Sequence, residues 1–211
     1  MSTKEIQNIV KERDIQYLLH FTRLSNLDGI LEHGVYPHSR LDELPHDVTI
    51  NDAGRWDNHP DSISLSICFP NYLMFFKYRK ESEDDWVVLV IHPNVLWESK
   101  CAFCKHNAAD GRISCLPVDQ IDDHNALSEM FDDIEDHRSR EDQKLKPCDP
   151  TDPQAEILTF DVISPEKIIG VVFRDKATKQ AYMEKYPDLK MYYHPESKGM
   201  FASRTYVREY V

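Results

Sequence analysis

The amino-acid sequence predicts a single α+β domain. Predicted strands and helices do not alternate regularly along the chain, as they would in a doubly wound parallel sheet. The sequence also lacks the GxGxxG and P-loop motifs that mark the common nucleotide-binding α/β folds. At 211 residues, the chain fits one domain, or one domain with a modest insertion, and it can bury a substantial core.

The first part of the chain predicts a helix, a strand and a second helix. Apolar residues at helical spacing indicate a helix over residues 4–13, and a compact apolar run indicates a strand over 17–21. A clearer helix follows over 25–34, where Ser25 is a favourable N-cap and Gly34 suits the C′ position.

The middle of the chain predicts a long loop, then a strand, a helix and a second strand. Residues 36–61 are rich in Pro, Asp, Asn, His and Gly, and loops of this length are usually functional or disordered. Residues 62–67 alternate small polar and apolar side chains, which is typical of a strand with one covered face. A helix is expected over 70–79, and the nearly continuous apolar run at 86–91 indicates a central strand.

The last part of the chain has a weaker pattern. Residues 101–150 are mixed, with a helical stretch near 125–138. Two strands are expected over 157–162 and 168–173, followed by a helix over 175–186. We expect the closing segment to form two short strands.

The net charge of −12 argues at first sight against a nucleic-acid partner, because phosphates are normally met by a basic surface. The charge is unevenly distributed. Residues 119–142 carry ten acidic side chains against two arginines, a net −8, whereas 167–211 carry nine Lys or Arg against five acidic residues, a net +4. Because the acidity is concentrated in one segment, the whole-chain charge does not decide the partner.

Cellular location and cysteine chemistry are indicated by composition. The N-terminal segment is charged, and no apolar run approaches the roughly 20 residues that cross a bilayer, which predicts a soluble cytoplasmic protein without a membrane partner. The five cysteines are then expected to be free thiols. Cys101, Cys104, His106 and Cys115 could in principle bind zinc, but the single CxxC has no matching second pair, so we predict no metal site.

Two side chains are candidates for catalysis, one directly after a loop and one inside a loop. Glu156 stands at the head of the predicted strand 157–162, directly after the loop sequence CDPTDPQA, so a rigid element aims its carboxylate at one face. A solvent-facing glutamate at a strand edge is the alternative. Arg55 lies in the long polar loop, where its permanently charged planar fork suits phosphate, although loop arginines are usually solvated.

Two strands carry candidate ligand-binding side chains. His20 and Thr22 project on the same side of an extended chain and could grip a ribose edge or a carboxamide, although a histidine at a strand end is often structural. Ser62, Ser64 and Ser66 place three hydroxyls on one strand face, which would either line a cleft or face solvent.

Four stretches of the sequence, in order, resemble the DarT family of DNA ADP-ribosyltransferases, which are toxins of toxin–antitoxin systems. They are LLHFTRLSNLDGILEHGV, RWDNHPDSISLSICFPNYLMFF, CAFCKHNAADGRI and QAEILTFDVISPEKIIGVVF, and they span residues 18–173. The resemblance implies an ADP-ribosyltransferase fold: a split, mainly antiparallel β-core with flanking helices. The whole chain, 1–211, would form one such domain, with an acidic insertion or loop at about 119–153.

The resemblance also implies a substrate, an acceptor and a partner. NAD would be the ADP-ribose donor and would bind in the cleft between the two halves of the sheet. The acceptor would be a base of single-stranded DNA, because a base inside a duplex cannot reach such a cleft. A macrodomain ADP-ribose hydrolase is the expected antitoxin.

By this resemblance, Glu156 is the catalytic glutamate, and Arg55 is the arginine that meets NAD and the acceptor base. His20 and Thr22 are expected to hold the nicotinamide-side ribose or carboxamide. The resemblance places further NAD contacts at Asn26, on the following helix start, at Ser64, on the hydroxyl-bearing strand, and at Tyr72 and Phe75, which could stack on nicotinamide.

Three other functions stay open from the sequence alone. The net acidity is compatible with a transferase that acts on RNA or protein instead of DNA. A module that binds NAD or ADP-ribose without catalysis is a second alternative. A zinc-stabilised interaction domain built on residues 101–115 is the third.

Overall fold

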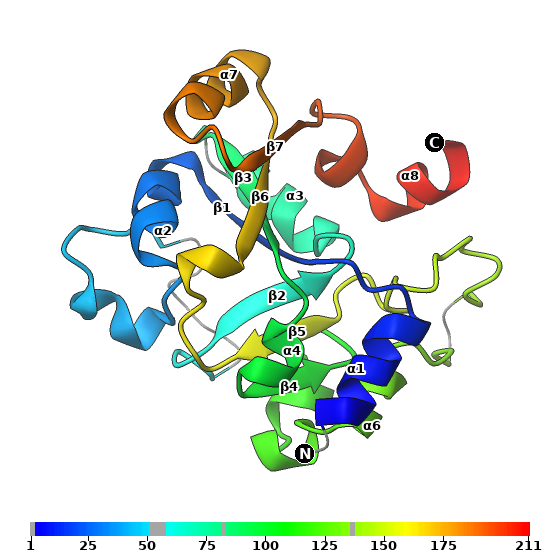
Figure 1. Cartoon of the computed structure of the whole chain (residues 1–211). Coiled ribbons are helices and arrows are strands. Elements are labelled where there is room, and N and C mark those ends of the chain that lie inside the picture. The colour runs from blue at the N-terminus through cyan, green and yellow to red at the C-terminus, as the bar shows by residue number, and fades with distance from the viewer. Residues whose placement is uncertain (1–2, 51–57, 82, 136–137) are drawn as a thin grey trace.

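A seven-stranded sheet runs through the molecule in the computed structural model, which describes residues 3–50, 58–81, 83–135 and 138–211 (Figure 1). The strand order is β4-β5-β2-β1-β3-β6-β7, and every pairing is antiparallel except that of β6 with β7. The strands are β1 (Leu18–Arg23), β2 (Ile63–Ile67), β3 (Trp86–Ile91), β4 (Cys101–Cys104), β5 (Glu156–Thr159), β6 (Ile168–Phe173) and β7 (Lys190–Tyr193).

The sheet separates two hydrophobic cores, because consecutive strand residues point to opposite faces. Within β3, Val87, Leu89 and Ile91 belong to the larger core, whereas Trp86 and Val88 belong to the smaller one. All residues of β3 are buried. Burial on both faces explains why this strand is a nearly continuous apolar run in the sequence.

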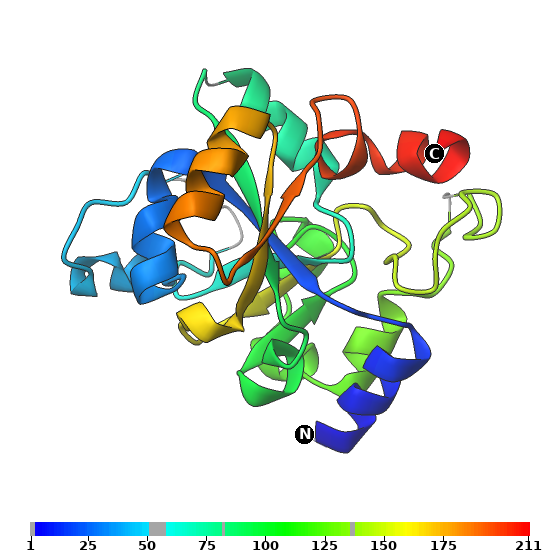
Figure 2. The same cartoon turned by 45° about the horizontal axis from the view of Figure 1, so that its top comes forward.

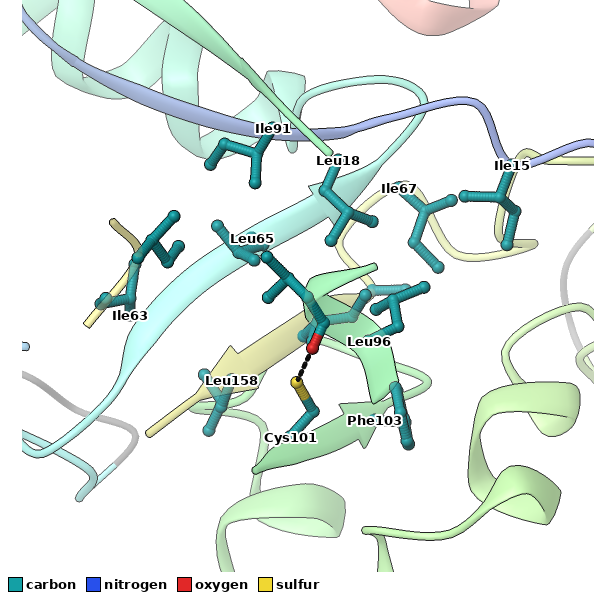
Figure 3. Packing of buried hydrophobic residues seen from close by; sticks show 14 of the residues in the cluster. Ile15, Leu18, Ile63, Leu65, Ile67, Ile91, Leu96, Cys101, Phe103 and Leu158 are labelled. Carbon is teal, nitrogen blue, oxygen red and sulfur yellow. Dashed lines mark hydrogen bonds between the residues drawn. The ribbon is translucent and has the colours of Figure 1, made fainter. Parts of the chain in front are cut away.

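Part of the larger core lies between β2, β4 and β5 (Figure 3). Leu18, Leu65 and Leu158 are almost fully buried there. The Cys101 thiol donates a hydrogen bond to the Val95 carbonyl at 3.5 Å, the dashed line in Figure 3, so this cysteine is a packed core residue.

The helices cover both faces and the ends of the sheet. α1 packs against α4 and α6 beside the β4 edge, while α7 packs on β6 and β7 at the opposite edge (Figures 1 and 2). Within the described ranges, none of the helices has the length and apolar character needed to cross a bilayer. The α-helices are α1 (Thr3–Glu12), α2 (Leu27–His33), α3 (Tyr72–Glu81), α4 (Val95–Glu98), α5 (Gly111–Ser114), α6 (His124–Glu129), α7 (Lys176–Lys185) and α8 (Arg204–Tyr210), and the 3₁₀ helices are Leu24–Asn26, His38–Glu43, Val118–Gln120, Pro165–Lys167 and Gly199–Phe201.

The sheet splits between its two central strands. β1 pairs with β2 only at Leu18 and Leu19, whereas it pairs with β3 along its whole length, from Leu18 to Arg23. From His20 onward, β1 therefore belongs to one half of the sheet and β2 to the other. The split, mainly antiparallel β-core expected from the sequence is confirmed.

Three local predictions are wrong. Ser25 does not cap a helix, because it lies inside a 3₁₀ turn and α2 begins after Asn26, without a side-chain cap. The mixed region 101–150 contains a strand, β4, and its predicted helix shrinks to His124–Glu129. The closing segment forms one strand and the helix α8 instead of two strands.

Candidate active site

A cleft opens where β1 and β2 separate, and it encloses about 1230 Å³ of space, including its open mouth. His20 Nδ1 lies 2.9 Å from the Ser64 carbonyl oxygen, across the split. Because a carbonyl can only accept, Nδ1 carries the proton in this bond, and the ring orientation is fixed. Both halves of the sheet contribute to the walls, through His20, Thr22, Ser62, Ser64, Ser66 and Glu156.

Glu156 is the buried carboxylate of this cleft. It begins β5 and its relative exposure is only 5%. Asn71 Nδ2 donates to its Oε1 at 3.3 Å, and the backbone amide of Ala108 donates to its Oε2 at 3.1 Å. Because each carboxylate oxygen accepts a hydrogen bond from a different segment of the chain, these two donors hold the side chain in one orientation.

Asn71 connects Glu156 to the start of α3. Its side-chain oxygen accepts from the backbone amide of Met74 at 3.2 Å, as an N-cap does, and its own backbone amide donates to Ser66 Oγ at 3.0 Å. The register of β2 with β5 pairs Leu65 with Ile157, so Ser66 comes opposite Glu156 on the same face. One asparagine thus fixes the helix, the strand and the carboxylate together.

The sequence analysis does not predict Asn71 or the Ala108 amide as a partner of Glu156. A backbone amide such as that of Ala108 has no sequence signature. Asn71 did have one, because an asparagine after a proline at the start of a helix is a good N-cap, and a capping asparagine keeps its side-chain amide free to donate elsewhere.

Thr22 and Asn26 also line the cleft, and both are buried. Asn26 Nδ2 donates to Thr22 Oγ1 at 3.1 Å and to the Thr49 carbonyl at 2.9 Å, while Asn26 Oδ1 accepts from the Thr49 amide at 2.9 Å. Both amide protons of Asn26 are therefore used within the protein. The expected contact of Asn26 with NAD stays a prediction. In this structure, the hydrogen bonds of Asn26 anchor the loop that contains Thr49.

That loop forms one wall of the cleft. Between residues 36 and 50 it supplies apolar side chains together with two histidines. The His46 ring stacks on His33 of α2 with ring centroids 5.3 Å apart. The loop residues that line the cleft are Tyr36, His38, Leu41, Leu44, His46, Val48, Thr49 and Ile50.

The predicted aromatic contacts of α3 are not at the cleft. Phe75 is 1% exposed and packs in the smaller core, stacked on Phe21 with ring centroids 4.6 Å apart. Tyr72 lies against Phe69 instead, with ring centroids 6.4 Å apart. Met74 and Tyr78 are the residues of α3 that line the cleft. Their spacing of four puts them on one side of the helix. The apolar run YLMFF does not reveal which side of the helix faces the cleft.

Arg55, the second predicted catalytic residue, lies outside the described residues. The zinc arrangement weighed from the sequence is not formed where the structure describes the chain. Cys101 and Cys104 are three residues apart on β4, so their side chains point to opposite faces. His106 Nδ1 is instead 2.8 Å from Asp152 Oδ2, in a buried pair close to β5.

A split antiparallel sheet with a buried glutamate at the head of a strand defines an ADP-ribosyltransferase-like enzyme. The family model described as "ssDNA thymidine ADP-ribosyltransferase, DarT" matches residues 19–200. The chain therefore belongs to the DarT family of ADP-ribosyltransferases. This confirms the resemblance found in the sequence and the class of enzyme it implied. No curated protein matches the sequence at a significant level.

Solved structures support the fold. Thermus sp. 2.9 DarT in complex with NAD+ is 14% identical, with a TM-score of 0.55, and the match covers 87% of this chain and 97% of that one. Thermus sp. 2.9 DarT in complex with ADP-ribosylated ssDNA is 12% identical, with a TM-score of 0.56 and coverages of 87% and 96%. Thermosipho africanus DarTG in complex with ADP-ribose is 12% identical, with a TM-score of 0.56, and this chain, covered over 88%, spans 51% of that longer one.

Proposed function

We propose that this protein transfers ADP-ribose from NAD+ to thymidine in single-stranded DNA, with Glu156 as the catalytic residue. The observation that carries the proposal is the buried Glu156 carboxylate in the cleft, held by Asn71 and the Ala108 amide. Membership of the DarT family supports the acceptor. The solved Thermus relative has been captured with NAD+ and with ADP-ribosylated ssDNA, which supports both substrates.

The chemistry needs negative charge close to the ribose. The bond between ribose C1′ and the nicotinamide nitrogen breaks, its electron pair leaves with nicotinamide, and the ribose becomes oxocarbenium-like. In this proposal Glu156 accepts a hydrogen bond from a ribose hydroxyl and stabilises that positive charge as it develops. His20, Thr22 and Ser64 hold the nicotinamide-side ribose or carboxamide.

The acceptor base completes the reaction at C1′. The thymine ring nitrogen that is not bonded to deoxyribose is N3, which carries a proton. A new C1′–N3 bond therefore requires that this proton be removed. Glu156 is the candidate base, whereas the Arg55 guanidinium stays protonated and is expected to orient substrate. Alignment of the two reacting atoms in the cleft adds to the rate.

The decisive experiment uses labelled NAD+ and oligonucleotides that differ only in the base offered. We expect transfer to a thymidine-containing single strand and a loss of about 100-fold or more in Glu156→Gln, which keeps the size but removes the charge. Glu184→Gln, an exposed glutamate of α7, is the matched control. Unchanged transfer in Glu156→Gln would refute the assigned role.

The same experiment separates the other functions. Labelling of RNA or protein, and not of DNA, would show that the enzyme uses a different acceptor. NAD+ binding without release of nicotinamide would show that the protein binds NAD+ but is not a transferase. The family match argues against both, because it names a DNA thymidine acceptor. The macrodomain antitoxin and the cytoplasmic location remain proposals for this chain. Co-expression with a macrodomain ADP-ribose hydrolase should relieve any toxicity that depends on Glu156.

A further inference from the structure

One face of α3 exposes apolar and basic side chains together. Leu73 is 45% exposed and Phe76 is 60% exposed, although both are large apolar residues. Lys77 and Lys80 are exposed on the same helix. The four residues recur at spacings of three and four, so they share one face.

The opposite face of α3 is firmly anchored. Phe75 is buried between Phe21, Trp86 and Phe201. The Arg79 guanidinium lies over the Phe75 ring at 4.7 Å and donates to the Phe201 carbonyl at 2.9 Å. The exposed face is therefore presented by a rigid element, which reduces the entropy lost when a ligand binds.

The exposed face adjoins the side of α3 that lines the cleft. Asn71, directly before α3, donates to Glu156, and Met74 lines the cleft. Lys77 follows Met74 by three residues, so the two side chains are neighbours on the helix surface. By helical spacing, Lys77 is the member of the exposed face next to Met74, and Leu73, Phe76 and Lys80 continue that face around the helix.

Charge and shape on this face suit single-stranded nucleic acid. Lys77 and Lys80 are cations in a chain of net charge −12. The exposed acids nearest in sequence are Glu81, four residues after Lys77 at the end of α3, and Glu83. Asp84 and Asp85, further along, have partners in Arg23 and Arg174. An exposed aromatic ring beside cations is the usual arrangement for stacking an unpaired base while its phosphates are neutralised.

We propose that this face of α3 binds the single-stranded DNA that flanks the modified thymidine. Phe76 stacks on a flanking base, Leu73 packs against the same nucleotide, and Lys77 and Lys80 contact phosphates. The proposal rests on the proposed function, because it concerns the path of that acceptor. The family assignment places none of these four residues in a role.

The test compares two variants, Phe76→Ala and the double variant Lys77→Gln/Lys80→Gln. The substrates are single strands with one thymidine, one of about 20 nucleotides and one of about 4, which brackets the size of a single-strand site. We expect about a tenfold rise in the KM of the long strand for Phe76→Ala, with little change for the short strand. The affinity for NAD+, measured by calorimetry, should be unchanged in both.

The double variant Lys77→Gln/Lys80→Gln is tested by the salt dependence of the KM. Removal of two phosphate contacts should reduce the slope of log KM against log salt by about 1.4, since each contact to a single strand contributes about 0.7. The matched control is Lys4→Gln/Lys11→Gln, which removes two exposed lysines from α1. Met183→Ala on α7 is the control for loss of an exposed apolar side chain. Both controls should behave as the unmodified protein.

The outcomes separate this proposal from the proposed function. If the unmodified protein fails to label either strand, the proposed function fails. If it labels both but the α3 variants keep the KM and the salt slope, the DNA path over α3 is wrong and the function stands. If the variants lower NAD+ affinity, or change the oligomeric state in light scattering without changing the KM, the face serves the fold or a second copy, and the proposal is overturned.

Discussion

Arg208 holds Asp149 through two hydrogen bonds, from Nε to Oδ2 at 2.6 Å and from Nη2 to Oδ1 at 2.8 Å. The Asp149 side chain is fully buried, and that of Arg208 is 8% exposed. This pair joins α8 to the segment of residues 146–152, which leads into β5 and Glu156.

Two further arginines donate hydrogen bonds to the same segment. The buried Arg204 donates to the carbonyls of Pro150 and Thr151 at 2.6 and 3.0 Å. Arg140 donates to the Asp149 carbonyl at 2.7 Å and to Thr151 Oγ1 at 3.0 Å. Since the backbone of residues 146–152 has little regular structure, these side chains supply the partners that a helix or strand would otherwise provide.

We expect the buried pair to be strongly coupled. Loss of one partner, as in Arg208→Met or Asp149→Leu, leaves an uncompensated buried charge and should lower the free energy of unfolding by about 3–5 kcal/mol. The double variant should lose less than the sum of the single losses. Urea unfolding of the four proteins gives the coupling energy, and strict additivity would contradict a direct interaction.

The two roles of Asn71 can be separated. Asn71→Ser keeps an N-cap for α3 but cannot reach Glu156, whereas Asn71→Ala loses both the cap and the contact. We expect Asn71→Ser to retain nearly full stability but to lower kcat roughly tenfold or more, because a hydrogen bond to a charged group is lost. Asn71→Ala should lower kcat similarly and also cost about 1 kcal/mol of stability. A normal kcat in Asn71→Ser would remove Asn71 from the site.

The sequence predicted best those elements that the cores define. The bounds of β3 and β6 agree with the predicted ranges 86–91 and 168–173, because these central strands are apolar runs buried on both faces. β4 was missed because it has only four residues and is established by pairing with the distant β5. α8 was missed because Arg204 and Arg208 hold it in place, and two arginines do not suggest burial in a sequence.

The same contrast holds for the site. His20, Ser64 and Glu156 were named from motifs, and the structure brings all three to one cleft. No motif points to Asn71 as a site residue, because its partner Glu156 lies 85 residues away in the sequence. Phe75 was misplaced because the run of apolar residues in α3 does not reveal which side faces the core.

Burial of Tyr17 predicts a loss of stability at high pH. Burial, reinforced by nearby Cys68 and Cys148, raises the pKa of Tyr17 from 10.0 to about 12. Since the folded-state pKa lies above the ordinary value, folding favours the protonated phenol. This contribution is complete below pH 10 and is lost as the pH rises from 10 towards 12.

The measurement is the urea midpoint between neutral pH and about pH 11, compared with Tyr17→Phe, which keeps the ring but cannot ionise. Other groups also titrate in this range, so the difference between the two proteins is the relevant quantity. Between pH 10 and about pH 11, the urea midpoint of Tyr17→Phe should fall less than that of the unmodified protein. Parallel curves would show that Tyr17 ionises as it does in the unfolded chain.

Gly29, inside α2, and Gly34, directly after it, should respond differently to substitution by alanine. A Cβ at Gly34 would come 2.3 Å from the Ile163 carbonyl oxygen. The φ angle of Gly34 is +96°, a backbone conformation that residues with a side chain rarely adopt. Because the obstacle is backbone, Gly34→Ala should lower the free energy of unfolding by about 1–3 kcal/mol. A Cβ at Gly29 would come 2.1 Å from Nε2 of His46, which can move with its loop.

We therefore expect Gly29→Ala to change binding more than stability. Displacement of His46 disturbs the loop that forms one wall of the cleft, so the Kd for NAD+ should rise several-fold while the unfolding midpoint changes little. Gly111→Ala is the control, because a Cβ at Gly111 meets nothing within 4 Å. Calorimetric titration with NAD+ and urea unfolding of the three variants provide the comparison. If Gly29→Ala bound NAD+ as tightly as Gly111→Ala does, the 36–50 loop would not contact the substrate, and the binding site would be confined to the strands of the split sheet.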